Sequence, residues 1–458
     1  MQPTSAVSAQ ERLLPATSPI RAAYAEQFRC IGSACEDTCC GGWSVPIDQP
    51  ALEAYQGIVP GPLRTLILAN ILRADERPSD AADRKTQPFA IIRMNDSNVC
   101  PMLDEDRLCR IQKKHGEALL SHTCATYPRI HVRYGAIQQT ALSFSCPEAA
   151  RLVLMHPDLL RRAEPSCSEA RARRELDAAV SPPPHFDAIQ QLVLRLAQNR
   201  NYPLWQRLFL LGLFCQRLDS IANGELNRTV PEFLRDFEAT IATGALRPAM
   251  ELLPADGAAQ LDMVLRLAGL LLHRSNIRPR FVECVQAFTA GIGNRPQATL
   301  QSLTANFADA HHRSYEPFLK RHPAMLENYL INTIVRCRFP FGKDTAEAET
   351  RNSMAREFTV LSAQFALMNG LLTGVAGYHR EAFSMAHVVR AMQSASKHFE
   401  HHPEFLNLAH TLLVESNMDG ARGASILLRN PARRGAPDGP RPASPEKGAQ
   451  EMPTRMSA

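Results

Sequence analysis

The feature that most constrains this chain is a short loop crowded with thiols. The loop places four cysteines within eleven residues, and a glycine pair and a tryptophan follow it directly. It carries too many sulfurs and too little apolar bulk for an ordinary core segment. Small and polar spacers let the backbone turn back on itself, so several sulfurs can converge on one point. The residues are Cys30, Cys35, Cys39, Cys40, Gly41, Gly42 and Trp43.

Four further cysteines extend the set, so that eight of the twelve lie between residues 30 and 146. Four thiolates hold a tetrahedral zinc or an iron–sulfur cluster when short loops bring distant segments together. Adjacent cysteines do not easily face the same ion, so we expect Cys39 and Cys40 to have different roles. The predicted ligands are Cys30, Cys35, Cys39, Cys40, Cys100, Cys109, Cys124 and Cys146.

The expected compartment decides between metal and disulfides. Residues 1–28 contain no continuous apolar stretch of the signal-peptide kind, and the most apolar run, 208–215, is far shorter than the ~20 residues of a membrane span. We therefore expect a cytoplasmic protein without a membrane span. Because that compartment keeps thiols reduced, clustered cysteines there favour metal over disulfides. The spacing leaves the choice between iron–sulfur and zinc open.

The charge of the chain is concentrated at one end. The formal net charge is +5, and the segment after residue 419 holds seven basic and three acidic residues. The remainder is close to neutral, which argues against a nucleic-acid-binding surface. The basic, proline-rich tail lacks interleaved aromatic residues and is interpreted as disordered.

Hydrophobic spacing predicts a mainly α protein, with a small cysteine-rich metal-binding α+β domain followed by an all-α helical domain. Apolar residues recur at i, i+3, i+4 and i+7 through the second half of the chain, which indicates roughly eight to ten helices of ordinary length. The predicted boundaries are a disordered N-terminus at 1–20, the cysteine-rich domain at 21–165, the helical domain at 185–417 and a disordered tail at 418–458.

Other residues with chemical potential have simpler structural interpretations. Asp104 and Glu105 fit a hairpin turn, Tyr127 fits a packed loop corner, and Asp37 belongs to the thiol-rich loop. Histidines near the cysteines are interpreted as surface or hydrogen-bonding residues, and those near the end of the helical half as a cluster at a helix C-terminus. Three glycines are interpreted as packing or helix-end positions. Four cysteines in helical patterns are interpreted as small core residues. These sets are His115, His122, His131, His398, His401 and His402; Gly370, Gly374 and Gly377; and Cys167, Cys215, Cys284 and Cys337.

Taken together, these motifs resemble the flagellin lysine-N-methylases, bacterial enzymes that methylate surface lysines of flagellin. The resemblance begins at Phe28 and runs through the thiol-rich loop to Trp43. It continues at Cys100-Pro-Met-Leu-Asp104, Leu108-Cys-Arg-Ile-Gln112 and Thr123-Cys-Ala-Thr-Tyr-Pro-Arg129, and less specifically at Leu326-Glu-Asn-Tyr-Leu330 and Phe339-Pro340. The cysteine elements also resemble small zinc- or iron-chelating proteins.

The resemblance implies methyl transfer from S-adenosylmethionine to lysine side chains of flagellin. It also implies a metal centre, a [4Fe–4S] cluster with zinc as the alternative. No glycine-rich loop between a strand and a helix marks a nucleotide site. The sequence therefore places neither the methyl-donor site nor a catalytic residue. A non-catalytic, metal-stabilised adaptor that binds a partner through its helical half is the competing hypothesis.

Overall fold

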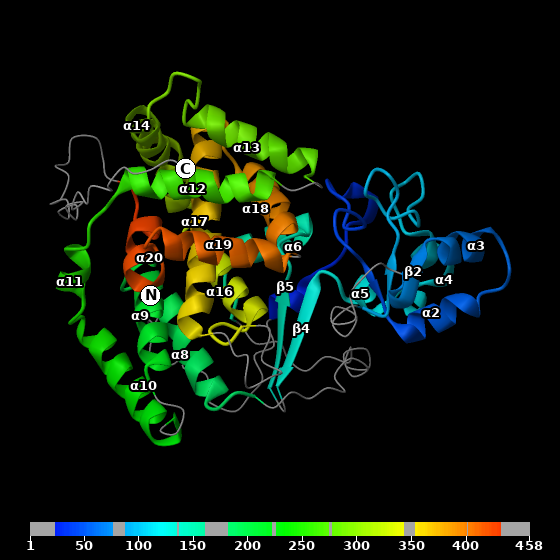
Figure 1. The fold of residues 1–458 in the computed structure, drawn as a ribbon, viewed down its shortest axis with the longest axis horizontal. Helices are drawn as coiled ribbons and strands as arrows, with labels where there is room; N and C mark the ends of the chain where they lie inside the picture. Colours follow the sequence, from blue (N-terminus) through cyan, green and yellow to red (C-terminus); the bar gives the residue numbers. More distant parts are fainter. Residues whose placement is uncertain are drawn as a thin grey trace, which may run out of the picture.

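The computed structural model describes residues 23–76, 88–134, 137–160, 182–221, 226–273, 277–342, 353–400 and 402–431. Within these residues the protein is mainly helical, as predicted. Figure 1 shows a large helical body with a smaller, cysteine-bearing lobe beside it. The disorder predicted for residues 1–20 and the part of the predicted tail beyond residue 431 lie outside the described residues, as do Cys167 and His401.

The small lobe is built around a three-stranded antiparallel sheet of order β1-β3-β2. The central strand pairs Ile91 with Pro46 on one side and with Leu72 on the other. Asp48 begins the next helix by accepting a hydrogen bond from the Ala51 amide, an ordinary N-cap. The elements are β1 (Pro46–Ile47), α2 (Gln49–Gln56), α3 (Pro62–Ala69), β2 (Ile71–Arg73), η3 (Ala74–Glu76), β3 (Ala90–Ile92), α4 (Arg110–His115), η5 (Glu117–Leu119) and α5 (His122–Thr126).

A two-stranded hairpin, β4 (Arg129–Tyr134) and β5 (Ile137–Leu142), joins the lobe to the body, and the sequence predicted this pair of strands. The side chain of Asn332 binds the backbone of Leu142 twice, accepting from its amide at 3.1 Å and donating to its carbonyl at 2.8 Å. Tyr24 also donates to Asn332, at 2.6 Å. These bonds fix the hairpin to the helical body because they satisfy backbone groups of a strand edge.

The buried residues form two cores that divide the chain differently from the predicted domains. Val45, Ile47 and Ile111 belong to the core of the lobe, whereas Phe28 and Phe144 belong to the core of the body. The predicted boundary near residue 165 lies outside the described residues and stays a prediction, although the cores group the residues before it differently. The hairpin and α6 (Pro147–Met155) lie with the helical body, because their apolar faces pack on its helices rather than on the lobe.

The body contains more helices than the eight to ten predicted, because several are only five or six residues long. They are α1 (Ala23–Gln27), α8 (Phe186–Gln198), α9 (Leu204–Asp219), α10 (Leu226–Thr243), α11 (Arg247–Glu251), α12 (Gly257–Leu272), α13 (Pro279–Gly291), α14 (Leu300–Ala310), η8 (His311–Tyr315), α15 (Glu316–Arg321), α16 (Met325–Cys337), α17 (Met354–His379), η9 (Arg380–Ala382), α18 (Met385–Phe399), α19 (Pro403–Glu415) and α20 (Gly420–Leu428).

Helix α17 runs through the middle of the body (Figure 1). It is apolar on all sides, and among the described helices it alone has the length and composition of a membrane span. The whole of its most apolar window is buried inside the protein. A helix of this kind is typical of the core of a large protein, and burial accounts for its composition.

The segment predicted to be a disordered tail begins with an ordered helix. In α20, Ala421, Ala424, Leu427 and Leu428 are buried against the body. The prediction of disorder for residues 420–428 was wrong. It rested on the basic and proline-rich composition of the residues that follow, whereas the short apolar repeat within 420–428 forms a helix. Small residues on α20 allow close approach: the Gly212 position of α9 lies against Ala421.

Candidate metal centre

The thiol-rich loop is held in shape by its glycines and by a second loop. Gly41 pairs with Val99, the Gly42 amide donates to the Asn98 carbonyl at 3.0 Å, and the Cys100 amide donates to the Cys40 carbonyl at 2.8 Å. Gly42 has φ of +86°, and a Cβ there would lie 2.9 Å from Arg278 Cδ. Only glycine meets both requirements without strain, so the glycine pair lets the loop turn back as predicted.

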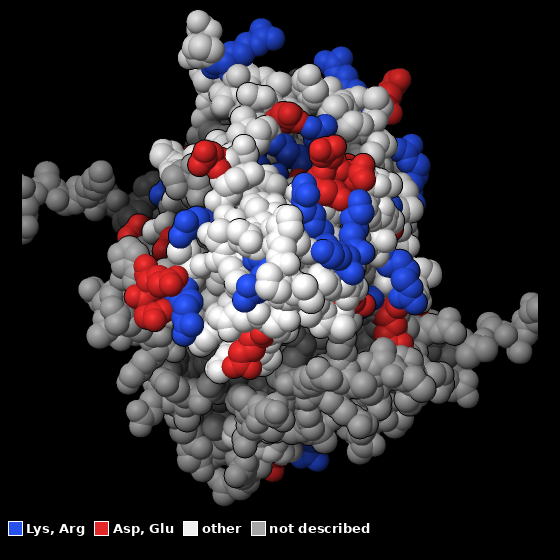
Figure 2. Space-filling view, turned by 90° about the vertical axis from the view of Figure 1, so that its right-hand side faces the viewer, with Lys and Arg blue, Asp and Glu red and all other residues white. Residues whose placement is uncertain are grey.

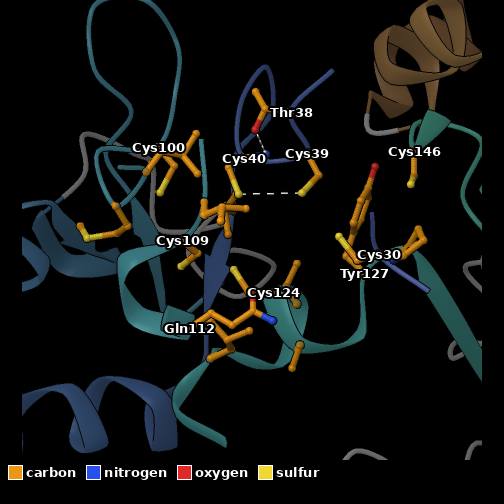
Figure 3. A pocket seen from close by; sticks show the side chains of 18 of the residues that line it. Cys30, Thr38, Cys39, Cys40, Cys100, Cys109, Gln112, Cys124, Tyr127 and Cys146 are labelled. Carbon is orange, nitrogen blue, oxygen red and sulfur yellow. Dashed lines mark hydrogen bonds between the residues drawn. The ribbon is translucent and has the colours of Figure 1, made fainter. Parts of the chain in front are cut away.

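All eight predicted ligands line one cavity of ≈ 400 Å³ (Figure 3). They come from separate segments that the fold brings together. Cys109 and Cys146 are the N-cap residues of α4 and α6, and Cys124 lies within α5. The predicted convergence of the two cysteine groups on a common space is therefore seen in the structure, whereas a bound metal stays a prediction.

The eight cysteines line the same cavity, but their sulfur atoms do not lie close to a single point. Cys39 Sγ and Cys40 Sγ lie 3.8 Å apart. Among the described residues, no three of the eight sulfurs lie within 4.8 Å of one another. In Figure 3, Cys40, Cys100, Cys109 and Cys124 surround one side of the cavity, and Cys30 and Cys146 lie on the other side with Tyr127.

The donor set fits a thiolate-held metal. Two sulfurs on a tetrahedral zinc are about 3.8 Å apart when each Zn–S bond is about 2.3 Å, and the sulfurs of Cys39 and Cys40 already have this separation. This separation would allow both sulfurs to bind one ion, and the expectation that Cys39 and Cys40 have different roles stays a prediction. Both iron–sulfur clusters and zinc take such ligands, so the geometry leaves that choice open.

The cavity holds its thiols in different electrostatic environments. Burial raises the pKa of Cys100 to about 11 and that of Cys124 and Cys146 to about 12. The hydrogen bond with Cys40 and the charge of Lys397 lower the pKa of Cys39. A metal must displace protons from thiols that burial keeps protonated, and Cys39 ionises most readily among these four.

A buried ion pair ties the thiol-rich loop to the helical body. Lys397 of α18 donates to the Asp37 carboxylate at 3.1 Å and to the Thr38 carbonyl at 2.5 Å. Gln393, one turn earlier, donates to the same carboxylate at 2.8 Å, and Arg278 lies 3.6 Å from it. Sequence reasoning missed these helical residues because nothing in their local pattern distinguishes them from surface positions of a helix.

A line of hydroxyl groups leads from the cavity into the body. Tyr127 hydrogen-bonds to Ser145 at 3.0 Å, Ser145 to Ser143 at 2.6 Å, and Ser143 donates to Glu400 at 2.5 Å. Glu400 forms a buried ion pair with Arg336 at 3.4 Å. Each hydroxyl can donate toward Glu400, so the line connects a cavity wall to a buried carboxylate.

The remaining sequence candidates keep their structural roles. Asp104 accepts from the Leu108 amide and pairs with Lys113 at 2.5 Å, as expected of a turn, and Glu105 is exposed. In the described part of the chain, no histidine lines the cavity: His115 is exposed, and His131 bonds to Thr140.

The predicted packing residues behave in the same way, with one exception. Cys215 and Cys284 are buried core residues, whereas Cys337 is partly exposed. Added Cβ atoms at Gly370 and Gly374 would clash with Val264 and Phe288, so these glycines are packing positions between helices. His398 is buried against Phe281.

Charged side chains on the face that includes the lobe are mixed in sign. Figure 2 shows lysines and arginines interspersed with acidic residues around a broad uncharged centre. A surface that grips a nucleic-acid backbone would present a positive stripe. This face shows no such stripe among the described residues, and the absence of a nucleic-acid partner stays a prediction.

Comparison with known proteins extends across both parts of the chain. Lysine-N-methylases of Salmonella typhimurium and Salmonella choleraesuis are each 26% identical over 395 residues, covering 82% of this chain and 91% of those proteins. The flagellar biosynthetic protein FliU of Salmonella muenchen is 37% identical over 142 residues, 31% of this chain and 80% of that protein. No solved structure matches the chain. Residues 190–427, more than half of the chain, match the FliB lysine N-methylase C-terminal domain, and the chain therefore belongs to the FliB lysine N-methylase family.

Proposed function

We propose that this protein is an S-adenosylmethionine-dependent methyltransferase that N-methylates lysine side chains of flagellin. Its eight-cysteine cavity would hold a metal centre, a [4Fe–4S] cluster or zinc. The observation that carries the proposal is the similarity to lysine-N-methylases over 82% of the chain, which includes the lobe and the body together. The flagellar name of a second relative supports flagellin as the substrate. A cytoplasmic location is part of this proposal, because that compartment keeps clustered thiols reduced.

Methylation requires a neutral lysine amine, whereas a free lysine side chain has a pKa near 10.4. The amine must lose a proton and lie in line with the methyl group of the donor. We infer that the cavity wall at Tyr127 receives this proton, since the hydroxyls of Tyr127, Ser145 and Ser143 lead it toward Glu400. A metal bound to the cysteines would cross-link the thiol-rich loop to the rest of the lobe.

Contacts between the lobe and the body support a proposal in which both parts of the chain act together in one enzyme. Lys397 and Gln393 hold Asp37 directly beside the cysteines, so the family-defining helical half sets the position of the thiol-rich loop. An adaptor with an independent metal knot would not need this buried contact. The competing adaptor hypothesis therefore has less support than the enzyme.

The experiment is an anaerobic purification followed by two measurements on the same sample. Iron, zinc and acid-labile sulfide are assayed first, and methyl-labelled S-adenosylmethionine and flagellin are then added. We expect label on flagellin lysines and none on flagellin whose lysines have been acetylated. A fully metallated sample that leaves flagellin unlabelled would contradict the enzyme and favour the adaptor. Zinc without sulfide would retain the enzyme and exclude the cluster.

A further inference from the structure

Far along the chain from the cysteines, one continuous helical segment contains a π-helical turn. Helix α14 ends at Ala310, the π turn η8 spans His311–Tyr315, and α15 continues from Glu316. A π turn is rare, costs hydrogen-bond geometry, and occurs frequently at functional sites because it re-aims side chains. No motif in the sequence marks this segment, and it has no part in the proposed methyl transfer.

The π turn brings three metal-ligating side chains together. The ligand atoms of His311, His312 and Glu316 all lie within 4.8 Å of one another. The two imidazole rings are 5.1 Å apart between centroids and stand at 89° to each other, so they do not stack. Two imidazoles and one carboxylate are a set that zinc-class metals use in proteins.

His311 points into this group without any other partner. Its side chain belongs to a residue that is only 1% exposed, and neither ring nitrogen has a hydrogen-bond partner among the described residues. Burial, and then the neighbouring His312, lower the pKa of His311 to about 4, which leaves the ring neutral with a free lone pair. An unpaired buried polar group is costly, and a bound cation would remove that cost.

The other two residues already have the supporting contacts that metal ligands have. His312 Nε2 lies 2.9 Å from the Pro431 carbonyl, while its Nδ1 faces Glu316 Oε2 at 2.9 Å. Lys320 binds the second oxygen of Glu316 at 2.9 Å. Metal-bound histidines typically donate their other N–H to a backbone carbonyl, and bound carboxylates are themselves hydrogen-bonded.

We propose that His311, His312 Nδ1 and Glu316 Oε2 form a second metal site, for a divalent ion of the zinc class, with a fourth position left to water. An ion bound at Nδ1 would take the place of the contact between His312 and Glu316, while the contact of His312 Nε2 with the Pro431 carbonyl is retained. The site thereby joins the π turn to the segment that follows α20.

The test compares full-length wild type with His312→Gln and His311→Leu, using cobalt(II) and zinc(II) added to chelator-treated protein. A glutamine amide at position 312 can keep a donor for the Pro431 carbonyl, and a leucine at position 311 fills the buried space without a ligand atom. We expect each variant to bind one equivalent less than wild type. The difference between the cobalt spectra of wild type and variant should contain no sulfur-to-cobalt charge-transfer band. The absence of this band would show that the lost site has no cysteine ligand.

Two controls separate a metal site from a merely structural histidine. His322→Gln changes an imidazole that packs on Phe318 nearby, and it should keep the wild-type metal count. Without metal, His311→Leu should melt no lower than wild type, because it removes an unpaired buried group. Added zinc should raise the Tm of wild type and of His322→Gln by more than it raises the Tm of His311→Leu, which keeps only the cysteine cavity. Equal metal counts in wild type and His312→Gln, a charge-transfer band in the difference spectrum, or equal loss in His322→Gln would each overturn the proposal.

Discussion

The ammonium group of Lys397 lies 3.1 Å from the carboxylate of Asp37, and the lysine side chain is only 2% exposed. One partner is on α18 of the body and the other is in the loop between Cys35 and Cys39. Burial lowers the pKa of Lys397, although the charge of Asp37 opposes the shift. A buried lysine of this kind is retained only where a partner compensates its charge, so the two parts of the chain depend on each other.

Substitution of this lysine should be costly. Lys397→Met leaves Asp37 with Arg278 and Gln393 but without its closest cation. Removal of one member of a buried pair costs roughly 3–5 kcal/mol, and the remaining partners place the expected loss at about 3 kcal/mol. Urea unfolding measures it. Lys113→Met, which breaks an ion pair whose lysine is 49% exposed, should change the free energy of unfolding far less. Equal losses in the two variants would contradict the coupling.

The cysteine convergence could be predicted because it depends on local composition. Closely spaced thiols with glycines beside them can only form a tight loop, and the structure places Cys30 and Cys146 on the same cavity. The contact from Lys397 to Asp37 spans 360 residues, and Lys397 occupies the last turn of α18, where a basic residue is ordinary. Tertiary packing alone makes it special, so its role could not be predicted.

The helical half shows the same limit. Apolar spacing predicted helices, and it also predicted that Gly370 and Gly374 are packing positions. It could not predict the π turn at His311, because hydrophobic periodicity over one turn does not separate i+4 from i+5 bonding. The pairing of Arg336 with Glu400 could not be predicted either, because the two residues are 64 positions apart in the sequence.

The buried pair of Arg336 and Glu400 gives the next prediction. Both side chains are at most 3% exposed, so Glu400→Gln leaves an uncompensated guanidinium in the core. We expect a loss of roughly 3–5 kcal/mol in the free energy of unfolding. Glu238→Gln, which breaks the exposed pair with Arg195, should cost less than about 1 kcal/mol. The double variant Arg336→Met/Glu400→Gln separates the two causes. If it is as stable as wild type, the loss in Glu400→Gln arises from the unpaired charge of Arg336. If it is as unstable as Glu400→Gln, the loss arises from the weakened hydrogen bond with Ser143.

Two helix glycines should respond in opposite ways to substitution by alanine, because only one of them lies at a close contact between helices, that of α17 with α13. An added Cβ at Gly374 would lie 2.8 Å from the Phe288 carbonyl oxygen, a backbone atom that cannot move aside cheaply. Gly374→Ala should cost about 1–3 kcal/mol. Gly269, within α12, has nothing within 4 Å of its added Cβ, so Gly269→Ala should stabilise the protein by up to about 1 kcal/mol. Thermal unfolding measures both, and a stabilising Gly374→Ala would refute the contact.

Acid stability should depend on a stacked pair of histidines. His379 and His387 lie 3.8 Å apart between ring centroids, and His387 Nδ1 accepts from the Ser384 amide at 3.2 Å in a capping box. Burial lowers the pKa of both, and His379 lowers that of His387 further. The unfolded chain therefore binds protons first, and stability falls as the pH decreases below the unfolded pKa of about 6.5.

Glutamine at position 387 should remove part of this pH dependence. A capping box accepts Gln at this position, so His387→Gln should match wild type at pH 8. Its urea midpoint should then fall less than that of wild type between pH 7 and pH 5. His115→Gln is the control, because His115 is exposed and lies outside the cap, so its urea midpoint should follow that of wild type across this range. Identical midpoints for His387→Gln and wild type across this range would contradict the prediction.

Metal binding at the cysteine cavity should depend on individual thiols that line it. Cys35→Ser removes a sulfur held by the Asp37 carbonyl at 3.0 Å, and the variant should lose metal and solubility together. Cys215→Ser changes a fully buried thiol in the core of the body and should keep the metal, even if the new hydroxyl lowers stability. Elemental analysis of anaerobically purified variants measures the metal content. Since serine oxygen is a poor ligand for soft thiolate-preferring centres, partial retention in Cys35→Ser would indicate zinc rather than a cluster. A soluble, fully metallated Cys35→Ser protein would exclude Cys35 from the ligand set and restrict it to the other seven sulfurs.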